Sequence, residues 1–298
     1  MKLKNLIIAI AAVTAAGGVI VAQNGGVQRT AAAVASFFER FGIEAAFAVD
    51  QQDAPAVGLA ESQSATDYRW TGSLAAGRSL EIKGVNGSIT VERAPGDEVV
   101  VTAEARARRS DPSAVRVERL EHGEGLTFCA VYPTPEGERA NECAPGSSGR
   151  MSTHRNDVQV DFRIEVPAGV SFIGRTVNGG VEAIDLQSDV VAATVNGDIE
   201  ISTTGFAEAE TVNGSIEASM GSDIREGVSF STVNGSISLD LPDDINADID
   251  ASWLNGSFES DVPFLLEGRV SRRSARGMLG AGGPELELET VNGSIRIR

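Results

Sequence analysis

A five-residue unit, Val-Asn-Gly-Ser-Ile or a close variant, occurs seven times in this chain and constrains its fold more than any other feature. The asparagine–glycine pairs of the copies are Asn86-Gly87, Asn178-Gly179, Asn196-Gly197, Asn213-Gly214, Asn234-Gly235, Asn255-Gly256 and Asn292-Gly293. From Asn178 onward the gaps are 18, 17, 21, 21 and 37 residues, so the last gap is close to two units with one degenerate copy. A period near 20 residues predicts stacked solenoid coils.

A meander of hairpins is the competing structure, because Asn-Gly between apolar residues also favours two-residue β-turns. In such a hairpin Val233 would face Ser236 and Thr232 would face Ile237, which mixes apolar and polar side chains on each face. Stacked coils place like residues on one another instead. We therefore expect an all-β parallel β-helix or β-solenoid, in which the asparagine amides form a ladder, glycine permits the corner backbone, and Val and Ile of each unit face inward.

The first 66 residues differ in composition from the repeats. Lys2 and Lys4 precede an apolar run from Leu6 to Ala22, which predicts a signal peptide over residues 1–22. The alternative is an uncleaved anchor, because this run of 17 residues is just long enough to span a bilayer. Residues 23–66 are expected to form a short helix and a flexible linker, and residues 67–298 the solenoid.

Charge and export limit the partners of the chain. The formal net charge is −17, so nucleic acid is an unsuitable partner, since phosphate binding needs a concentrated basic face. The acidity indicates a solvated outer surface that discourages pairing between β-rich molecules. We expect an exported protein of the periplasm or cell surface, with membrane contact only through an uncleaved N-terminal segment.

The two cysteines, Cys129 and Cys143, predict a structural disulfide, because both lie in the part of the chain that would enter an oxidising compartment. Two unpaired buried thiols are the alternative. The bond would close a turn-rich disulfide loop at 129–143, which interrupts the repeats. We expect any feature specific to this chain to lie in that insertion.

Residues that could support catalysis or metal binding do not form a known motif. His122 and His154 lack the spacing of zinc ligands and are expected to be solvent-facing loop residues. The densest acidic cluster extends from Asp240 to Asp250 and could bind Ca²⁺ or hold an acid and base pair, but its alternation favours a solvated strand face. An arginine group, Arg269 to Arg276, is expected to balance this acidity. We predict no cofactor, no metal and no catalytic residue.

Three features of the sequence belong together: the repeated Thr-Val-Asn-Gly-Ser-Ile, the element Val166-Pro167-Ala168-Gly169-Val170, and the terminal Leu286-Glu287-Leu288-Glu289 ahead of the last repeat. With these features the chain resembles the bacterial putative-adhesin family of unknown-function β-strand-repeat domains. The similarity covers about Trp70 to Arg298 and implies an exported parallel β-helix without a catalytic set to transfer.

We expect a non-catalytic, adhesin-like scaffold of the cell envelope, whose partner is an envelope protein or a glycan. Two alternatives remain from the sequence. A glycan-active β-helix enzyme would need carboxylates that converge from neighbouring coils in one groove. An accessory protein in envelope stress is the other, and no residue pattern supports it.

Overall fold

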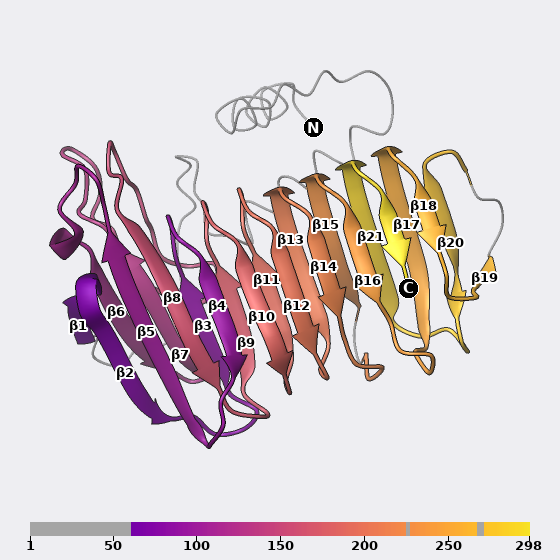
Figure 1. Cartoon of the computed structure of the whole chain (residues 1–298), viewed down its shortest axis with the longest axis horizontal. Helices are drawn as coiled ribbons and strands as arrows, with labels where there is room; N and C mark the ends of the chain where they lie inside the picture. The colour runs from indigo at the N-terminus through magenta and orange to yellow at the C-terminus, as the bar shows by residue number, and fades with distance from the viewer. Residues whose placement is uncertain (1–60, 225–226, 267–270) are drawn as a thin grey trace.

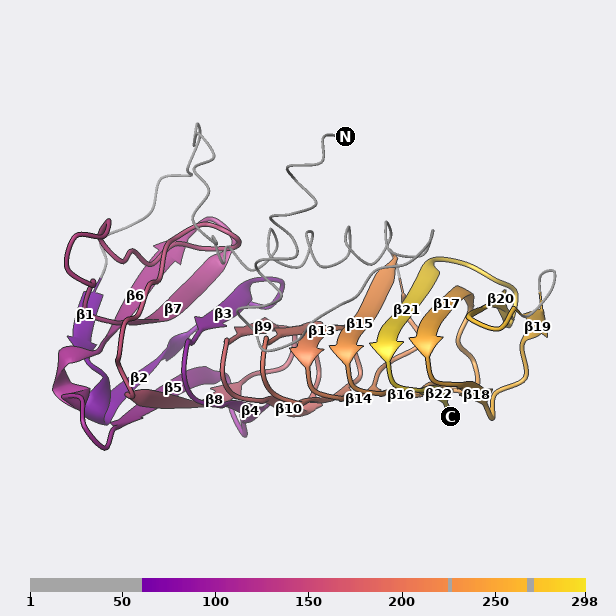
Figure 2. The same ribbon diagram turned by 90° about the horizontal axis from the view of Figure 1, so that it is seen from above.

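Two β-sheets lie face to face along the length of the chain (Figure 2). The computed structural model describes residues 61–224, 227–266 and 271–298. The predictions for residues 1–60, which include the signal peptide, the helix and most of the linker, lie outside these residues. One sheet has twelve strands and the other has ten, and the apolar side chains between them form the core. The predicted all-β solenoid is confirmed.

The centre of the molecule is a stack of rungs (Figure 1). Each rung has one strand in each sheet, and the Asn-Gly corner joins the two. In sequence order the rungs are β3 (Ser79–Lys83) with β4 (Ile89–Arg93), β9 (Ser171–Arg175) with β10 (Val181–Leu186), β11 (Val190–Ala193) with β12 (Ile199–Thr203), β13 (Ala207–Asn213) with β14 (Ile216–Ser219), β15 (Val228–Asn234) with β16 (Ile237–Asp240), β17 (Ala247–Asn255) with β18 (Phe258–Ser260), and β21 (Glu285–Asn292) with β22 (Ile295–Ile297). Neighbouring rungs pair in parallel and in register, so like residues stack.

The spatial order of the rungs departs from their order in the sequence at the C-terminal end. The last rung in the sequence, β21 with β22, lies between the β15 rung and the β17 rung. In its described residues, the 37-residue gap from Asn255 to Asn292 contains no degenerate parallel coil, so that expectation is wrong. It contains β19 (Leu265–Leu266) and β20 (Ser274–Leu279), and β20 runs antiparallel along the outer edge of β17.

Antiparallel strands close the other end of the stack, where the parallel rungs stop. They are β1 (Glu61–Ser64), β2 (Tyr68–Ser73), β5 (Glu98–Arg106) and β6 (Arg116–His122), together with the 3₁₀ turns η1 (Ala65–Asp67) and η2 (Pro112–Ala114). Between this cap and the β3 rung lie β7 (Gly125–Val131) and β8 (Gln159–Val166), which pair in parallel with β3 and β4. The first described strand is β1, which starts at Glu61. Such caps protect strand edges that would otherwise pair with another chain.

The core follows from the two-residue alternation of the strands. In β8, Val160, Phe162 and Ile164 are buried between the sheets, while the intervening charged residues face outward. Phe128, Phe172 and Phe230 are also fully buried in this core. Within the described residues, no helix has the length and hydropathy needed to cross a membrane.

Candidate functional site

The seven asparagines of the repeat form one continuous side-chain ladder along the corners of the stack. Each Nδ2 donates to the Oδ1 of the neighbouring asparagine, and all six bonds measure 2.8 Å. In spatial order the ladder runs Asn86, Asn178, Asn196, Asn213, Asn234, Asn292 and Asn255. Beyond Asn86, the ladder ends on the main-chain oxygen of Val158 at 3.4 Å. The amides point in one direction, so each internal asparagine both donates and accepts.

The glycines of the corners are needed because the rungs approach closely. A β-carbon on any of six of them would overlap the carbonyl oxygen of the glycine in the adjacent rung, and one on Gly87 would overlap that of Val160. The six are Gly179, Gly197, Gly214, Gly235, Gly256 and Gly293. Only Gly87 and Gly179 have a positive φ. The backbone geometry expected from the sequence therefore explains the need for glycine at two corners, whereas close stacking of the rungs explains it at all seven.

A second ladder, which the sequence analysis missed, uses the threonine two positions before the asparagine. The hydroxyl of each threonine donates to the carbonyl of the glycine in the preceding rung, over 2.8–3.0 Å. These residues are Thr176, Thr194, Thr211, Thr232 and Thr290, and all are buried. The two rungs without a threonine are the outermost ones, which carry Gly84 and Trp253 at this position. The repeated Thr-Val-Asn-Gly was the sequence pattern that could have predicted this threonine ladder.

At four of the corners, those of Val177, Val195, Val212 and Val233, the valine of the unit does not belong to the main core, contrary to expectation. In β15, Phe230 and Thr232 point inward and Val233 points to the other side, so the two-residue alternation continues up to the corner. Val195 and Val212 pack instead with Ala193, Val177 and Val233 in a separate apolar ridge outside the core. Ile199, Ile216 and their counterparts do face inward. The buried threonine hydroxyl is tolerated there because it is hydrogen-bonded.

The strands β7 and β8, which pair in parallel with the first rung, are joined by an insertion instead of an Asn-Gly corner. Between β7 and β8 the chain makes a long excursion, residues 132–158, here called the cysteine loop. Tyr132 closes its base, because its hydroxyl donates to the main-chain oxygen of Val158 over 3.0 Å. Asn141 joins its two halves by donating to the main-chain oxygens of Tyr132 and Ser152, over 2.9 and 2.8 Å.

A disulfide ties the cysteine loop to the outer face of the twelve-stranded sheet. Cys129 lies on β7 and Cys143 lies in the loop, with their Cα atoms 5.7 Å apart. Both sulfurs pack with Leu120 and Val131 in a small buried cluster. The predicted disulfide is therefore present, and it holds the loop against β7 next to the first repeat rung.

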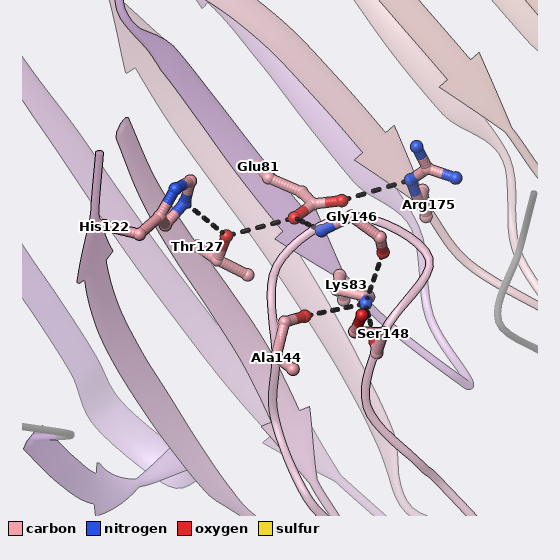
Figure 3. Close-up of polar contacts among 8 residues, drawn as sticks. All are labelled: Glu81, Lys83, His122, Thr127, Ala144, Gly146, Ser148 and Arg175. Carbon is pink, nitrogen blue, oxygen red and sulfur yellow. Dashed lines mark hydrogen bonds and ion pairs between the residues drawn. The ribbon is translucent and has the colours of Figure 1, made fainter. Parts of the chain in front are cut away.

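Lys83 and Glu81 hold the loop from the side of the sheet (Figure 3). They alternate on β3 with the core residues Leu80 and Ile82, so they lie on the outer face. The Lys83 ammonium donates to three loop carbonyls, those of Ala144, Gly146 and Ser148, over 2.8, 2.8 and 2.7 Å. All three protons of the ammonium therefore have an acceptor.

Glu81 is only 3% exposed and forms the second half of this contact. Its carboxylate accepts from the main-chain nitrogen of Gly146 at 2.9 Å, from the Thr127 hydroxyl at 3.0 Å and from Arg175 Nε at 3.1 Å (Figure 3). His122 in turn contacts Thr127 at 3.0 Å. We call Glu81, Lys83 and Arg175 the clamp. A buried carboxylate is tolerable when it is paired and hydrogen-bonded in this way.

Burial also weakens proton binding by the lysine of the clamp. Desolvation lowers the pKa of Lys83 to about 8, although the nearby Glu81 carboxylate acts in the opposite direction. Beside the clamp, a pocket of about 100 Å³ lies between the loop and the first two corners, and Val85, Val177, Glu142 and Met151 contribute to its wall. A pocket of this size accommodates only a small group or a few waters.

The comparisons with known proteins concern the repeats. The family model described as Toastrack DUF4097 matches residues 151–298, which form all the described rungs except the first, together with β8. Residues 151–298 are a toastrack domain of the DUF4097 family. The resemblance to an adhesin-like family of β-strand repeats is thereby confirmed. No curated protein matches the chain.

Two solved structures are similar to the chain. One is described as a putative cell adhesion protein from Clostridium sporogenes, with 10% identity and a TM-score of 0.42 over 78% of this chain and 98% of the other. The second is described as a putative adhesin from Bacteroides fragilis, with 11% identity and a TM-score of 0.32 over 78% and 97%. At these values the similarity carries no argument about function.

The acidic cluster of the toastrack domain is spread over both sheets. Asp240 ends β16 in the ten-stranded sheet, with Arg298 Nε 3.4 Å from its Oδ1. Asp250 lies on β17 in the twelve-stranded sheet, where Arg276 donates to it over 3.0 and 2.7 Å. Among the described residues, no group of three or more His, Cys, Asp or Glu is placed to hold a metal ion. These aspartates therefore do not converge as the glycan-active alternative requires.

Outside the clamp, His154 and Arg276 lie as the sequence predicts, whereas His122 does not. His154 is exposed in a bend, as expected, whereas His122 is the half-buried last residue of β6 and contacts Thr127. Arg276 forms an ion pair with Asp250, in line with the expected balance of local acidity. Arg269 lies outside the described residues.

Proposed function

We propose that this protein is a non-catalytic, exported interaction scaffold of the cell envelope, and that the cysteine loop is its recognition element. The observation that carries the proposal is the clamp. A loop that interrupts the repeats is held by a disulfide and by four hydrogen bonds, three donated by Lys83 to the loop and one accepted by Glu81 from the loop. A rigidly held loop loses little conformational entropy when it binds a partner.

The tip of the loop is the part available to a partner. Residues 133–140 carry the exposed charged side chains Glu136, Glu138 and Arg139, while the clamp and the disulfide hold the segment that follows. Rigid scaffolds that present an irregular loop are a common way to build binding sites. A mixed-charge tip suits a polar partner, either a glycan or a protein surface of the envelope.

The features that predict export support the same proposal. A disulfide persists in an oxidising compartment, and the first 22 residues have the pattern of a signal peptide. An acidic, stacked β-protein with an antiparallel cap on its first rungs is suited to stay soluble there, since the charge and the cap both discourage edge pairing. The adhesin label of the two similar structures agrees with this reading but does not carry it.

The test compares the loop tip with a sheet face in the full-length protein. Binding to a glycan array and to intact envelope is measured for the wild type, for Glu136→Ala with Glu138→Ala and Arg139→Ala, and for the control Glu182→Gln with Glu200→Gln. The control residues are exposed neighbours on the ten-stranded sheet. We expect saturable binding that the tip variant loses and the control keeps. Binding that only the control loses, or release of products from a polysaccharide panel, would contradict the proposal.

A further inference from the structure

The repeat asparagines share a chemical liability, because each precedes a glycine. In an Asn-Gly pair the glycine nitrogen can attack the Cγ of the preceding asparagine side chain. Glycine offers the least steric hindrance to this attack, since it lacks a side chain. A fold that contains seven such pairs must therefore hold the nitrogen and the amide apart, or it loses its asparagines with time.

The stack protects six of the seven pairs. In those corners the glycine N–H donates to the main-chain oxygen of the asparagine in the next rung, over 2.8–3.0 Å. The protected glycines are Gly87, Gly179, Gly197, Gly214, Gly235 and Gly293. Their neighbours also hold the asparagine amides in the ladder. The reacting nitrogen is thus occupied, and the side chain has no freedom to turn toward it.

The seventh pair, Asn255-Gly256, lies on the outermost rung. The antiparallel pairing of β20 with β17 extends to Ser252, and a last main-chain bond reaches Trp253, so no rung covers the corner beyond it. Within the described residues, Gly256 N–H has no hydrogen-bond acceptor, and nothing donates to the Oδ1 of Asn255. Asn255 is exposed and keeps only the bond from its Nδ2 to Asn292.

We propose that Asn255 is a site of spontaneous deamidation in the folded protein, and that the six other repeat asparagines are protected. The nitrogen of Gly256 gives its proton to solvent and bonds to Cγ of Asn255. Nδ2 takes up a proton from solvent, the bond from Cγ to Nδ2 breaks, and ammonia leaves. Water then opens the resulting succinimide at one of its two carbonyls. The product is aspartate or isoaspartate, and no oxidant or reductant takes part.

The modification acts on the end of the stack. The new carboxylate cannot donate to the Oδ1 of Asn292, so the last bond of the ladder is lost. Isoaspartate also lengthens the main chain by one atom between β17 and β18. The ring contacts of Phe258 with Trp253 at 5.7 Å and with Phe264 at 5.8 Å cover this end, and we expect them to loosen.

The experiment follows the conversion of each asparagine in the full-length protein. Samples kept at mildly alkaline pH, folded or in urea, are digested and mapped by mass spectrometry with fragmentation. Asn213, Asn234 and Asn292 are matched references, because each is also followed by Gly-Ser. We expect Asn255 to convert at least about tenfold faster than these references in the folded protein, which corresponds to about 1.4 kcal/mol in the barrier. In urea the four rates should converge.

A variant and a separate peptide in the same digest keep the outcome unambiguous. The variant Asn255→Gln should abolish the fast conversion and leave the references unchanged, since the longer side chain does not form the five-membered ring. Asn24-Gly25 lies outside the described residues, and mass spectrometry follows its conversion on a separate peptide. An internal asparagine that converts as fast as Asn255 in the folded protein would overturn the proposal. So would an advantage of Asn255 that persists in urea, because it would then come from local sequence.

Discussion

The corner stack and the cysteine loop meet at the first rung, yet they are stabilised in different ways. In the stack the same few residues repeat, and each contact joins a residue to its own copy in the next rung. The loop contacts do not repeat, and those of Lys83 reach loop carbonyls 61 to 65 residues away in the sequence. The comparison indicates that repetition gives the molecule its rigid length, whereas the unique contacts position one irregular segment on it.

The largest expected effect that tests this comparison is at a corner glycine. In Gly214→Ala the new β-carbon overlaps the carbonyl oxygen and carbon of Gly197, which are main-chain atoms that cannot move aside. We expect a loss of at least about 3 kcal/mol in the free energy of unfolding, at the upper end of overpacking effects. Chemical denaturation measures it. Gly96→Ala is the matched control, because a β-carbon there meets nothing within 4 Å, and it should change little.

Removal of the disulfide should affect the loop more than the stack. The double variant Cys129→Ser with Cys143→Ser opens a loop with a sequence separation of 14, which corresponds to about 3 kcal/mol in the unfolded-chain model. Hydrogen exchange should rise across residues 132–158 and stay low at the corner glycines. Equal loss of protection in both regions would show that the loop is part of the same cooperative unit as the stack.

A pH titration separates the clamp from the ladder, because the ladder contains no titratable group. Burial lowers the pKa of Lys83 from 10.5 to about 8, so between these values the unfolded chain binds more protons than the folded one. Stability from this group therefore rises with pH across that window, by up to about 1.4 kcal/mol per pH unit. The difference in unfolding free energy between the wild type and Lys83→Met, measured from pH 7 to 10, should show this slope. A difference independent of pH would contradict the lowered pKa.

The sequence predicted the stack of rungs correctly but did not predict the spatial order of the rungs. The Asn-Gly pairs identify the corners, but β21 takes a place between β15 and β17 that their nearly identical motifs do not encode. The inward threonine was missed because the valine beside it looked like the apolar residue of the corner. It is the two-residue alternation through Phe230 and Thr232 that places the threonine inside.

The clamp was not predictable, for a different physical reason. Glu81 and Lys83 occupy the polar positions of an alternating strand, and most such residues face solvent. Their burial depends on a loop whose path is set by the disulfide and by Tyr132. The cysteine pair indicated where the chain departs from the repeats, but not which face of the sheet the loop would cover.

The smallest expected effect tests the central claim, that the asparagines are a structural ladder, most directly. Asn213 both donates to Asn196 and accepts from Asn234, whereas Asn255 at the open end makes one such bond. Unfolding free energies are measured for Asn213→Ala and Asn255→Ala. We predict a loss of about 2 kcal/mol for Asn213→Ala, with two partners left unpaired, and at most about 1 kcal/mol for Asn255→Ala. Equal losses, or an unchanged stability for Asn213→Ala, would contradict the ladder.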